Sequence, residues 1–369
     1  LYIFVKGDKT QGLVLPYFLN MDRRRNVTLQ FADGTSFNLA EEGLTLNMSS
    51  GQITLQGTLY DDVLIGNDLD NEISGSNGND TLIGGKGNDI LKGNDGNDTY
   101  VWNLGDGFDT INDSYGQNVI RFGEGISFAD LSFEQKDNNF ERDLYIFVKG
   151  DKTQGMVLPY FINSAAHRNF ILQFADGTSF NLAEEGLTLN MSNGQITLQG
   201  TPYDDILIGN DLDNTINAAD GDDVYIGGKG NDTIEDPSGN DTYIWNLGDG
   251  LDMVKDITGE DKIVFGEGIT RDDLSFEQVG NDLKILVNGD NSAGVQIQYH
   301  FANDMFKVES VEFADGSMLD IGNADQLIQA MNSFSSSNSA STDTLSEPIQ
   351  DVGDMYNLAV NNELARKTA

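Results

Sequence analysis

The sequence contains no cysteine, only two histidines, and 21 basic residues against 60 acidic ones. Without cysteine there are no disulfide bonds and no thiol chemistry. The net charge of −39 repels nucleic acids and anionic membrane surfaces, so neither is an expected partner. This charge also opposes compaction unless cations lie among the carboxylates. No apolar run is long enough to span a membrane, and no amino-terminal signal peptide is visible.

Recognisable catalytic motifs are also missing. His167 and His300 have no cysteine or histidine partner at metal-ligand spacing, and no G-x-S-x-G motif occurs. We therefore interpret both histidines as surface or turn residues. The sequence predicts no catalytic residue, and we expect the chain not to be an enzyme.

Glycine and aspartate, by contrast, recur every nine residues from Gly57 to Val101. The five nines read GTLYDDVLI, GNDLDNEIS, GSNGNDTLI, GGKGNDILK and GNDGNDTYV. Glycine stands first in each nine, aspartate stands sixth in four of them, and the eighth residue is Leu, Ile or Tyr. A flexible linker rich in glycine and aspartate would not keep such a residue at the eighth place five times. The period therefore indicates a repeat fold.

The spacing suits calcium, which takes six to eight oxygen ligands from carboxylates and backbone carbonyls. A glycine-rich hexad can turn its carbonyls toward an ion, and a three-residue strand follows with its middle residue pointing inward. Two nines then form one coil, so alternate loops stack at the same edge. This arrangement predicts that Asp62 lies next to Asp80, Asp80 next to Asp98, and Asn71 next to Asp89. The Asn71 site should be the weakest because an amide adds no charge.

A second coil from Gly200 to Ile244 repeats the pattern less regularly. It reads GTPYDDILI, GNDLDNTIN, AADGDDVYI, GGKGNDTIE and DPSGNDTYI. The sixth place holds Asp205, Asn214, Asp223, Asp232 and Asp241. Two leading glycines are replaced, by Ala218 and by Asp236, and Pro237 follows the latter. Because proline fixes φ and lacks an N–H, we expect distorted loops and fewer or weaker ions than in the first coil.

The chain is internally duplicated. Residues 1–132 align with residues 144–275 at a constant offset of 143, and a looser third copy covers 282–320. The shared module has alternating apolar residues and F-A-D-G turns, which predict a small antiparallel patch that caps the end of a coil. Because Leu1 opens inside such a module, we expect the chain to be the carboxyl-terminal part of a longer protein. Trp102 and Trp245 directly follow the two coils. One interpretation is that these side chains form a platform for a ligand. We favour the other, in which they are buried and close the last turn of each coil.

These patterns predict an all-β fold: two parallel β-roll solenoid blocks interleaved with small antiparallel β modules, with short helices at the carboxyl terminus over 324–334 and 349–364. The six predicted segments are module 1 (1–50), β-roll 1 (51–113), module 2 (114–193), β-roll 2 (194–256), module 3 (257–322), and a terminal helix, Ser-rich linker and secretion signal (323–369).

The repeats, modules and tail together resemble the RTX family of Gram-negative bacteria, including iron-regulated Frp-type proteins and RTX cytolysins. The modules are similar to the haemolysin-type calcium-binding-related domain. The resemblance implies Ca²⁺ ligation by the sixth-place aspartates and by loop carbonyls. The residues implied are Asp62, Gly78, Asp80, Gly87, Asp89, Gly96, Asp98, Asp205, Gly221, Asp223, Gly230, Asp232, Gly239 and Asp241. Some Frp-like proteins cleave themselves at Asp-Pro, but we interpret Asp236-Pro237 as a degenerate repeat.

By this resemblance, the type I secretion machinery exports the protein, guided by an uncleaved carboxyl-terminal signal, and the protein is secreted or associated with the cell surface. We expect a calcium-binding folding and export module of a secreted toxin or related effector. An adhesin that contacts a host cell surface through exposed aromatic side chains is the alternative, and an enzyme is the third hypothesis.

Overall fold

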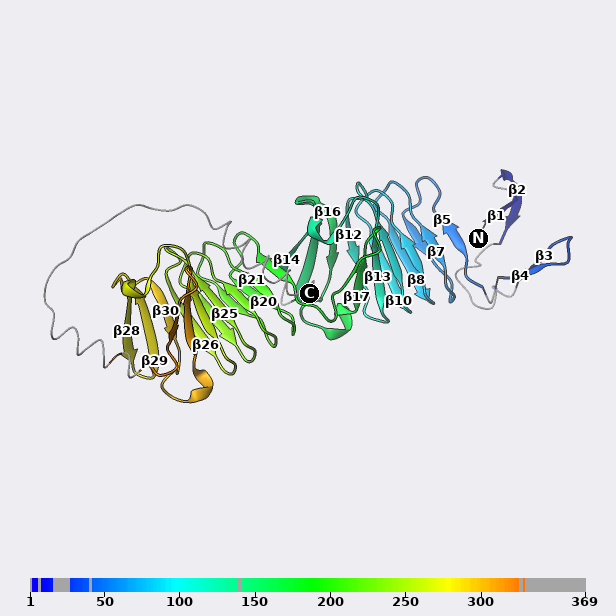
Figure 1. The fold of residues 1–369 in the computed structure, drawn as a ribbon. Coiled ribbons are helices and arrows are strands. Elements are labelled where there is room, and N and C mark those ends of the chain that lie inside the picture. The colour runs from blue at the N-terminus through cyan, green and yellow to red at the C-terminus, as the bar shows by residue number, and fades with distance from the viewer. Residues whose placement is uncertain are drawn as a thin grey trace, which may run out of the picture. The chain divides into compact units, whose positions relative to one another are not determined.

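The computed structural model describes residues 2–5, 8–15, 27–39, 42–138, 141–324 and 328. These residues are almost entirely β-strands joined by turns, and they form two compact units, Leu1–Glu185 and Gly186–Ala369. Each unit is a parallel β-solenoid, which confirms the predicted fold class (Figure 1). The terminal helices predicted over 324–334 and 349–364 lie, apart from residues 324 and 328, outside the described residues.

Two ladders of strands build the first unit, in the orders β18-β17-β13-β11-β9-β7-β5 and β14-β15-β16-β12-β10-β8-β6. The bounds are β5 Thr45–Asn47, β6 Thr54–Gln56, β7 Val63–Ile65, β8 Glu72–Asn77, β9 Thr81–Ile83, β10 Ile90–Asp95, β11 Thr99–Trp102, β12 Phe108–Ile111, β13 Asn118–Phe122, β14 Leu131–Asn138, β15 Glu141–Val148, β16 Asp151–Leu158, β17 Phe170–Gln173 and β18 Ser179–Asn181. Two hairpins come earlier in the chain: β1 Tyr2–Val5 with β2 Asp8–Val14, and β3 Thr28–Gln30 with β4 Ser36–Asn38.

The second unit repeats this topology in the orders β32-β31-β27-β25-β23-β21-β19 and β20-β22-β24-β26-β30-β29-β28. The bounds are β19 Thr188–Met191, β20 Thr197–Gln199, β21 Ile206–Ile208, β22 Thr215–Asn217, β23 Val224–Ile226, β24 Thr233–Asp236, β25 Thr242–Trp245, β26 Leu251–Asp256, β27 Lys262–Phe265, β28 Leu274–Val279, β29 Asp282–Val287, β30 Gly294–Ile297, β31 Ser310–Phe313 and β32 Met318–Asp320. Single 3-10 turns lie at η2 Phe128–Asp130, η3 Ala165–Arg168, η4 Arg271–Asp273 and η5 Asp304–Phe306.

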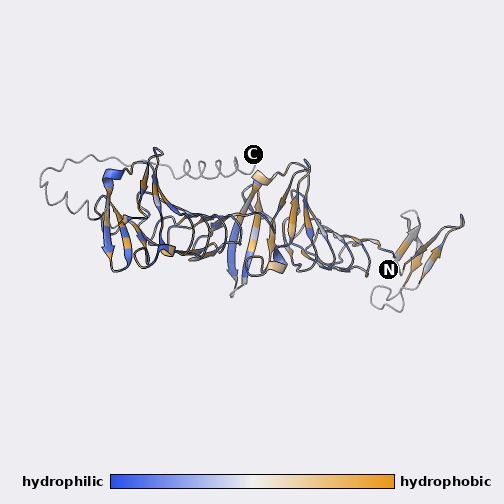
Figure 2. Ribbon diagram, turned by 60° about the horizontal axis from the view of Figure 1, so that its bottom comes forward, coloured by the Kyte–Doolittle hydropathy of each residue, from blue (hydrophilic) through white to orange (hydrophobic). Residues whose placement is uncertain are grey.

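We call β5 to β13 the first roll and β19 to β27 the second roll. Within a roll, successive turns pair in parallel at a spacing of 18 residues, as Val63 does with Thr81. The spacing lengthens to 20 at the end of each roll, where Thr99 lies opposite Val119. The eighth-place residues point inward and form the core; Leu64, for example, is completely buried. In Figure 2 hydrophobic residues lie along the strands, and many of the connecting loops are hydrophilic.

The modules after each roll continue its ladders, as the sequence predicted for end caps. In the first unit β14, β15 and β16 form an antiparallel meander, and β16 then pairs in parallel with β12. The hairpin tip falls at Lys149 and Gly150, which both adopt positive φ. In the second unit β28, β29 and β30 repeat the meander beside β26. The exposed edge of each roll is therefore paired rather than left open.

Both tryptophans are core residues, which confirms the packing interpretation. Trp102 is 2% exposed and packs edge-on against Phe122, and Trp245 is 1% exposed and packs against Phe265 in the same way. They do not close the last turn, however. Strands β13 and β27 add a further turn beyond them, so that part of the prediction was wrong.

Candidate metal centres

The sixth-place residues lie where a loop enters a strand, at the two edges of each roll. Asp62 directly precedes β7, and Asp89 directly precedes β10 at the opposite edge. Side chains alternate between the two faces along a strand, so a residue whose neighbour points toward solvent itself points into the roll. The eight predicted aspartates are accordingly at most 1% exposed: Asp62, Asp80, Asp89, Asp98, Asp205, Asp223, Asp232 and Asp241.

Hydrogen bonds link these aspartates into columns. The backbone N–H of each residue donates to Oδ1 of the aspartate one turn later: from Asp62 to Asp80 at 2.7 Å, and from Asp80 to Asp98 at 2.7 Å. At the opposite edge Asn71 donates to Asp89 at 2.7 Å. The second roll repeats the pattern with Asp205, Asp223, Asp241, Asn214 and Asp232. The structure thus brings together the pairs that the alternation of nines predicts.

The second oxygen of most of these carboxylates has no partner. Buried oxygens without a hydrogen bond are the Oδ2 atoms of Asp80, Asp89, Asp98, Asp223, Asp232 and Asp241. Burying a carboxylate oxygen without a partner is costly, and a cation removes that cost. Asp62 and Asp205 differ, because their Oδ2 atoms accept hydrogen bonds from the N–H groups of Thr58 and Thr201. The Oδ2 atoms of these two residues are therefore less available as ligands for a cation.

The leading glycines make room for these oxygens. A Cβ atom on Gly75 would lie 2.1 Å from Asp80 Oδ2, and one on Gly84 would lie 2.2 Å from Asp89 Oδ2. Backbone carbonyls approach the same points; a Cβ on Gly57, for example, would lie 2.3 Å from the carbonyl oxygen of Gly75. The donors are carboxylate and carbonyl oxygens, which fit calcium and do not suit metals that prefer nitrogen or sulfur.

The fourth-place glycines predicted as carbonyl ligands all have positive φ, as the loop requires: Gly78, Gly87, Gly96, Gly221, Gly230 and Gly239. They stack in their own column. A Cβ on Gly96 would lie 1.9 Å from the carbonyl oxygen of Gly78. Their role as ligands stays a prediction. The first-place carbonyls next to the aspartates were missed, although the invariant first glycine of the first coil was a signal for them.

Burial shifts the acidity of these groups strongly. Desolvation raises the pKa of Asp80 to about 7, of Asp89 to about 6 and of Asp223 to about 10. Neighbouring carboxylates add to the shift, as Asp98 does for Asp80. Without a cation, the raised pKa of Asp223 favours a bound proton at neutral pH, whereas the pKa values of Asp80 and Asp89 place their protonation at or just below neutrality. A divalent ion competes with that proton.

The asparagines at the sixth place behave differently from the aspartates. Asn71 Oδ1 accepts a hydrogen bond from Asn67 N at 2.9 Å, and its Nδ2 donates to Asn67 Oδ1 at 3.2 Å. Asn214 makes the same pair of bonds with Asn210. Both amides are satisfied by the protein itself, in keeping with the prediction of a weak site at Asn71.

The columns of sixth-place residues extend beyond the residues that the nine-residue spacing predicts. Asp89 N donates to Asp109 Oδ1 at 2.9 Å, and Asp98 N donates to Asn118 Oδ1 at 2.9 Å. In the second roll Asp252 and Asp261 take these places. All four were missed because the spacing changes from 18 to 20 residues. The signal was the sequence Gly105-Asp106-Gly107-Phe108-Asp109, which contains the end of a hexad shifted by two residues.

Comparison with known families and proteins supports the calcium interpretation. Residues 65–100 and 199–234 match the family described as RTX calcium-binding nonapeptide repeat (4 copies). Residues 282–322 match the haemolysin-type calcium binding protein related domain. RTX nonapeptide repeats bind calcium, so Ca²⁺ is the ion that these columns hold.

Two proteins illustrate the extent of the similarity. Iron-regulated protein FrpA of Neisseria meningitidis serogroup C is 34% identical over 94 residues, which are 24% of this chain and only 8% of FrpA. The extracellular lipase LipA from Serratia marcescens is 19% identical over 64% of this chain and 37% of its own, with a TM-score of 0.18.

Among the described residues, no helix is both long and apolar enough to cross a membrane. The nonapeptide matches, the related domain and the buried aspartate columns agree with one another. The chain therefore carries two sets of RTX calcium-binding nonapeptide repeats and a haemolysin-type calcium-binding related domain.

Proposed function

We propose that this chain is a calcium-dependent folding and export module of a secreted RTX protein. Inside a bacterium free calcium is low, and the acidic repeats repel one another and remain loose enough for a type I secretion channel. Outside the cell calcium reaches about 0.1–1 mM, the range of extracellular calcium modules. Ions then bind the folded rolls only, which stabilises them by mass action.

The observation that carries this proposal is the set of buried aspartate oxygens without a hydrogen-bond partner. They belong to Asp80, Asp89 and Asp98 and to the corresponding aspartates of the second roll. Stacked carboxylates at this depth repel one another, and the sites exist only when the turns are stacked. Calcium binding and folding are therefore linked.

The wider biological role follows from the RTX resemblance. RTX repeat proteins are typically secreted. We propose that the chain acts within a longer toxin or related effector, and that calcium is structural here, so that the repeats themselves catalyse no reaction. The small share of FrpA that is matched gives no direct information on the activity of such a protein.

The test is far-UV circular dichroism of the chain in excess chelator and after addition of about 2 mM calcium, which exceeds the range of about 0.1–1 mM over which extracellular modules bind. We expect the strand signal to be weak in chelator and to appear with calcium. Magnesium at the same concentration is the matched control, because it dehydrates reluctantly and demands octahedral geometry. A full strand signal in chelator, or equal folding with magnesium, would contradict the proposal.

The adhesin alternative has less structural support. It requires exposed aromatic side chains on the modules between the rolls. Phe147, Phe170 and Phe174 of the second module are at most 3% exposed, and Phe313 of the third is equally buried. Phe31, Tyr115 and Tyr299 are exposed, one in each predicted module, and Tyr299 packs against Phe306.

A further inference from the structure

Asp236 and Asp256 are buried aspartates of the second roll that lie outside the sixth place of the repeat. Asp236 occupies the first place of its nine, and Asp256 lies one turn later. Asp236 ends β24, Asp256 ends β26, and the two are direct partners in the parallel register. Both are buried, at 1% and 0% exposure. Two carboxylates therefore stack inside the roll, on the strand side of the aspartate column.

A tyrosine holds each of these carboxylates. The hydroxyl of Tyr225 donates to Asp236 Oδ2, and the hydroxyl of Tyr243 donates to Asp256 Oδ2 at 2.6 Å. The two rings stack with their centroids 5.2 Å apart and an angle of 14° between their planes. Buried, stacked rings cannot easily change position, so the carboxylates are oriented in advance of any ligand.

The oriented carboxylates meet the column of sixth-place aspartates at two points. Ligand oxygens of Asp223, Asp236 and Asp241 all lie within 4.8 Å of one another, and so do those of Asp241, Asp256 and Asp261. Among the described residues, three potential ligands come this close only at these two places. Asp241 belongs to both groups, so the two groups are immediate neighbours.

Unpartnered oxygens point to a ligand in each group. They are Asp223 Oδ2, Asp241 Oδ2, Asp256 Oδ1 and Asp261 Oδ2, and each of these residues is at most 1% exposed. A tyrosine hydroxyl donates one hydrogen bond and cannot neutralise a carboxylate. Five buried carboxylates in contact must be neutralised by protons or by cations, and hard divalent ions prefer such oxygens.

We propose that Asp236 and Asp256 complete two adjacent calcium sites inside the second roll, one with Asp223 and Asp241 and one with Asp241 and Asp261. Each site has three carboxylates, whereas stacked sixth-place aspartates alone supply two. The affinity of a calcium site rises with the number of its charged ligands. These sites therefore bind calcium more tightly than the sites of the first roll. This inference rests on the proposed calcium-dependent folding and extends it to residues outside the repeat pattern.

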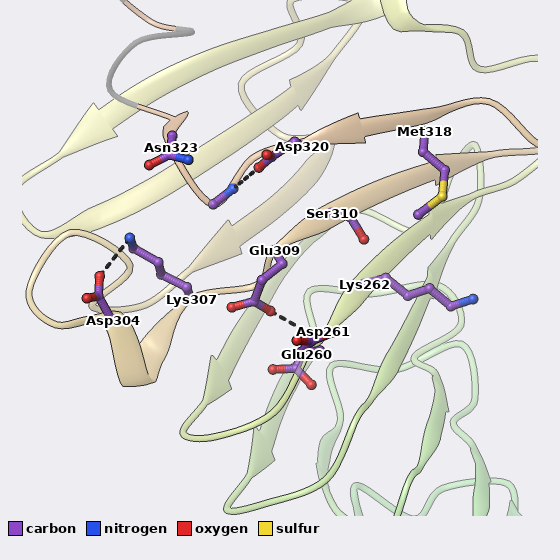
Figure 3. A pocket seen from close by; sticks show the side chains of 11 residues that line it. Glu260, Asp261, Lys262, Asp304, Lys307, Glu309, Ser310, Met318, Asp320 and Asn323 are labelled. Carbon is purple, nitrogen blue, oxygen red and sulfur yellow. Dashed lines mark hydrogen bonds and ion pairs between the residues drawn. The ribbon is translucent and has the colours of Figure 1, made fainter.

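An acidic cavity gives these sites a path to solvent. Asp261 lines a cavity of about 880 Å³ together with Glu260, Glu309 and Asp320. Glu309 points toward Asp261, and its Oε2 accepts a hydrogen bond from Asp261 N at 2.8 Å (Figure 3). The lining lysines are paired: Lys262 with Glu312 at 2.9 Å, and Lys307 with Asp304 at 2.8 Å. The cavity can therefore attract a cation to the end of the column.

The first roll supplies a matched control. At the positions 143 residues earlier it has Gly93 in place of Asp236 and Asn118 in place of Asp261. Asp113 corresponds to Asp256 and accepts a hydrogen bond from Tyr100 at 2.5 Å. The first roll thus has the tyrosine and the inner aspartate but lacks the third carboxylate at both points.

The experiment compares calcium affinity in the full chain and in the variants Asp236→Asn, Asp256→Asn and Asp113→Asn, by competition with a chromophoric chelator. Folding of each variant in saturating calcium is checked by circular dichroism. We expect the two second-roll variants to lose the tightest binding by about tenfold or more, and Asp113→Asn to leave it unchanged. An equal loss in all three variants, or no loss in the second-roll pair, would overturn the proposal.

Terbium luminescence excited through tyrosine gives a second readout. Tyr225→Phe keeps every carboxylate but removes the hydroxyl that orients Asp236. Tyr243 and Trp245 still sensitise bound terbium in this variant, so the readout is the midpoint of the terbium titration, which we expect to rise by about 10- to 100-fold. An unchanged midpoint would overturn the proposal even if the Asp236 variant fails to fold. A wild-type chain that binds no calcium would instead reject the proposed function.

Discussion

The two rolls share one topology but differ in the charge of their inner column. Where the first roll has Gly93 the second has Asp236, and where the first has Asn118 the second has Asp261. From the sequence we expected weaker calcium binding in the second roll, because two leading glycines are replaced there. We propose the opposite, because one of those losses brings a carboxylate next to Asp241.

The difference teaches that departure from a repeat pattern is not always decay. The loop position of a residue decides its effect. A leading glycine makes room for the carboxylate oxygen of its own nine, as Gly75 does for Asp80. An aspartate at the same place fills the space that glycine leaves for that oxygen. It can still add a ligand for the cation, provided that a partner such as Tyr225 orients its carboxylate inward. Regularity and ligand number are thus alternative routes to a cation site.

The largest effect is expected where the rolls are alike. Gly96 and Gly239 both have strongly positive φ, and a Cβ on either would lie within 1.9 Å of the carbonyl oxygen of the preceding turn. Gly96→Ala and Gly239→Ala should each destabilise the calcium-bound fold by about 2–5 kcal/mol, because both backbone strain and overlap are introduced.

Denaturant unfolding in saturating calcium measures both variants. Gly105→Ala is the control, because Gly105 also has positive φ but open space around it. It should cost only about 1–2 kcal/mol. A loss at Gly96 no larger than that at Gly105 would show that the turns are not stacked as closely as the structure has them.

The next effect separates the rolls directly. Each roll contains one buried tryptophan, so Trp102→Phe leaves Trp245 to report on the second roll, and Trp245→Phe leaves Trp102 to report on the first. Calcium titrations of tryptophan fluorescence should give a midpoint about tenfold lower for the second roll, because its sites have more carboxylates. Equal midpoints, or a lower midpoint for the first roll, would reverse the comparison.

A smaller effect concerns pH in the absence of calcium. Burial raises the pKa of Asp80 to about 7 and that of its counterpart Asp223 to about 10, against about 3.9 in an unfolded chain. The folded state then binds more protons than the unfolded state. Its stability is greatest at low pH and is lost as pH rises through the folded pKa.

Lowering the pH from about 9 to 5 in chelator should therefore stabilise residual structure, beginning with the second roll, since its raised pKa values extend higher. The single-tryptophan variants report each roll during the titration. Loss of structure on acidification within this range would show that the carboxylates are not buried in the calcium-free chain.

The smallest effect is expected at the surface. Lys86 pairs with Asp68, and Lys229 pairs with Asp211, each at 2.9 Å with the same high side-chain exposure. Exposed ion pairs contribute little because water and salt screen them. Lys86→Ala and Lys229→Ala should leave the thermal midpoint and the calcium midpoint unchanged within error. A clear shift in one roll only would reveal a difference that the columns do not explain.

Much of the fold could be predicted from the period alone. A nine-residue repeat with an apolar eighth residue specifies inward side chains and alternating edges, so the neighbours Asp62, Asp80 and Asp98 follow from counting. The column residues at the end of each roll could not be predicted by counting in nines. Two extra residues precede Asp109, and the spacing of nine no longer identifies it as part of the column.

The inner aspartates were harder still to predict. Asp236 looks like damage in the sequence because it replaces a glycine and precedes a proline. Only the three-dimensional register shows that it stacks on Asp256 and faces Tyr225. The spacing from tyrosine to aspartate is 11 residues in that pair and 13 for Tyr243 and Asp256. No single period relates the two, so a linear pattern could not show them.

The ladder of backbone donors and carboxylate acceptors has a direction. In the column of sixth-place residues the donor is the earlier turn and the acceptor the later one, from Leu44 onward in the first roll and from Leu187 onward in the second. The fifth-place carboxylates Asp61 and Asp204 run the other way, because they accept from the later turn. Removing turns from the carboxyl end thus leaves a backbone N–H of the sixth-place column without its acceptor, whereas removing turns from the amino end leaves a carboxylate oxygen of that column without its donor. The two ends of a roll are not interchangeable, and anyone lengthening such a protein should insert whole turns in the middle.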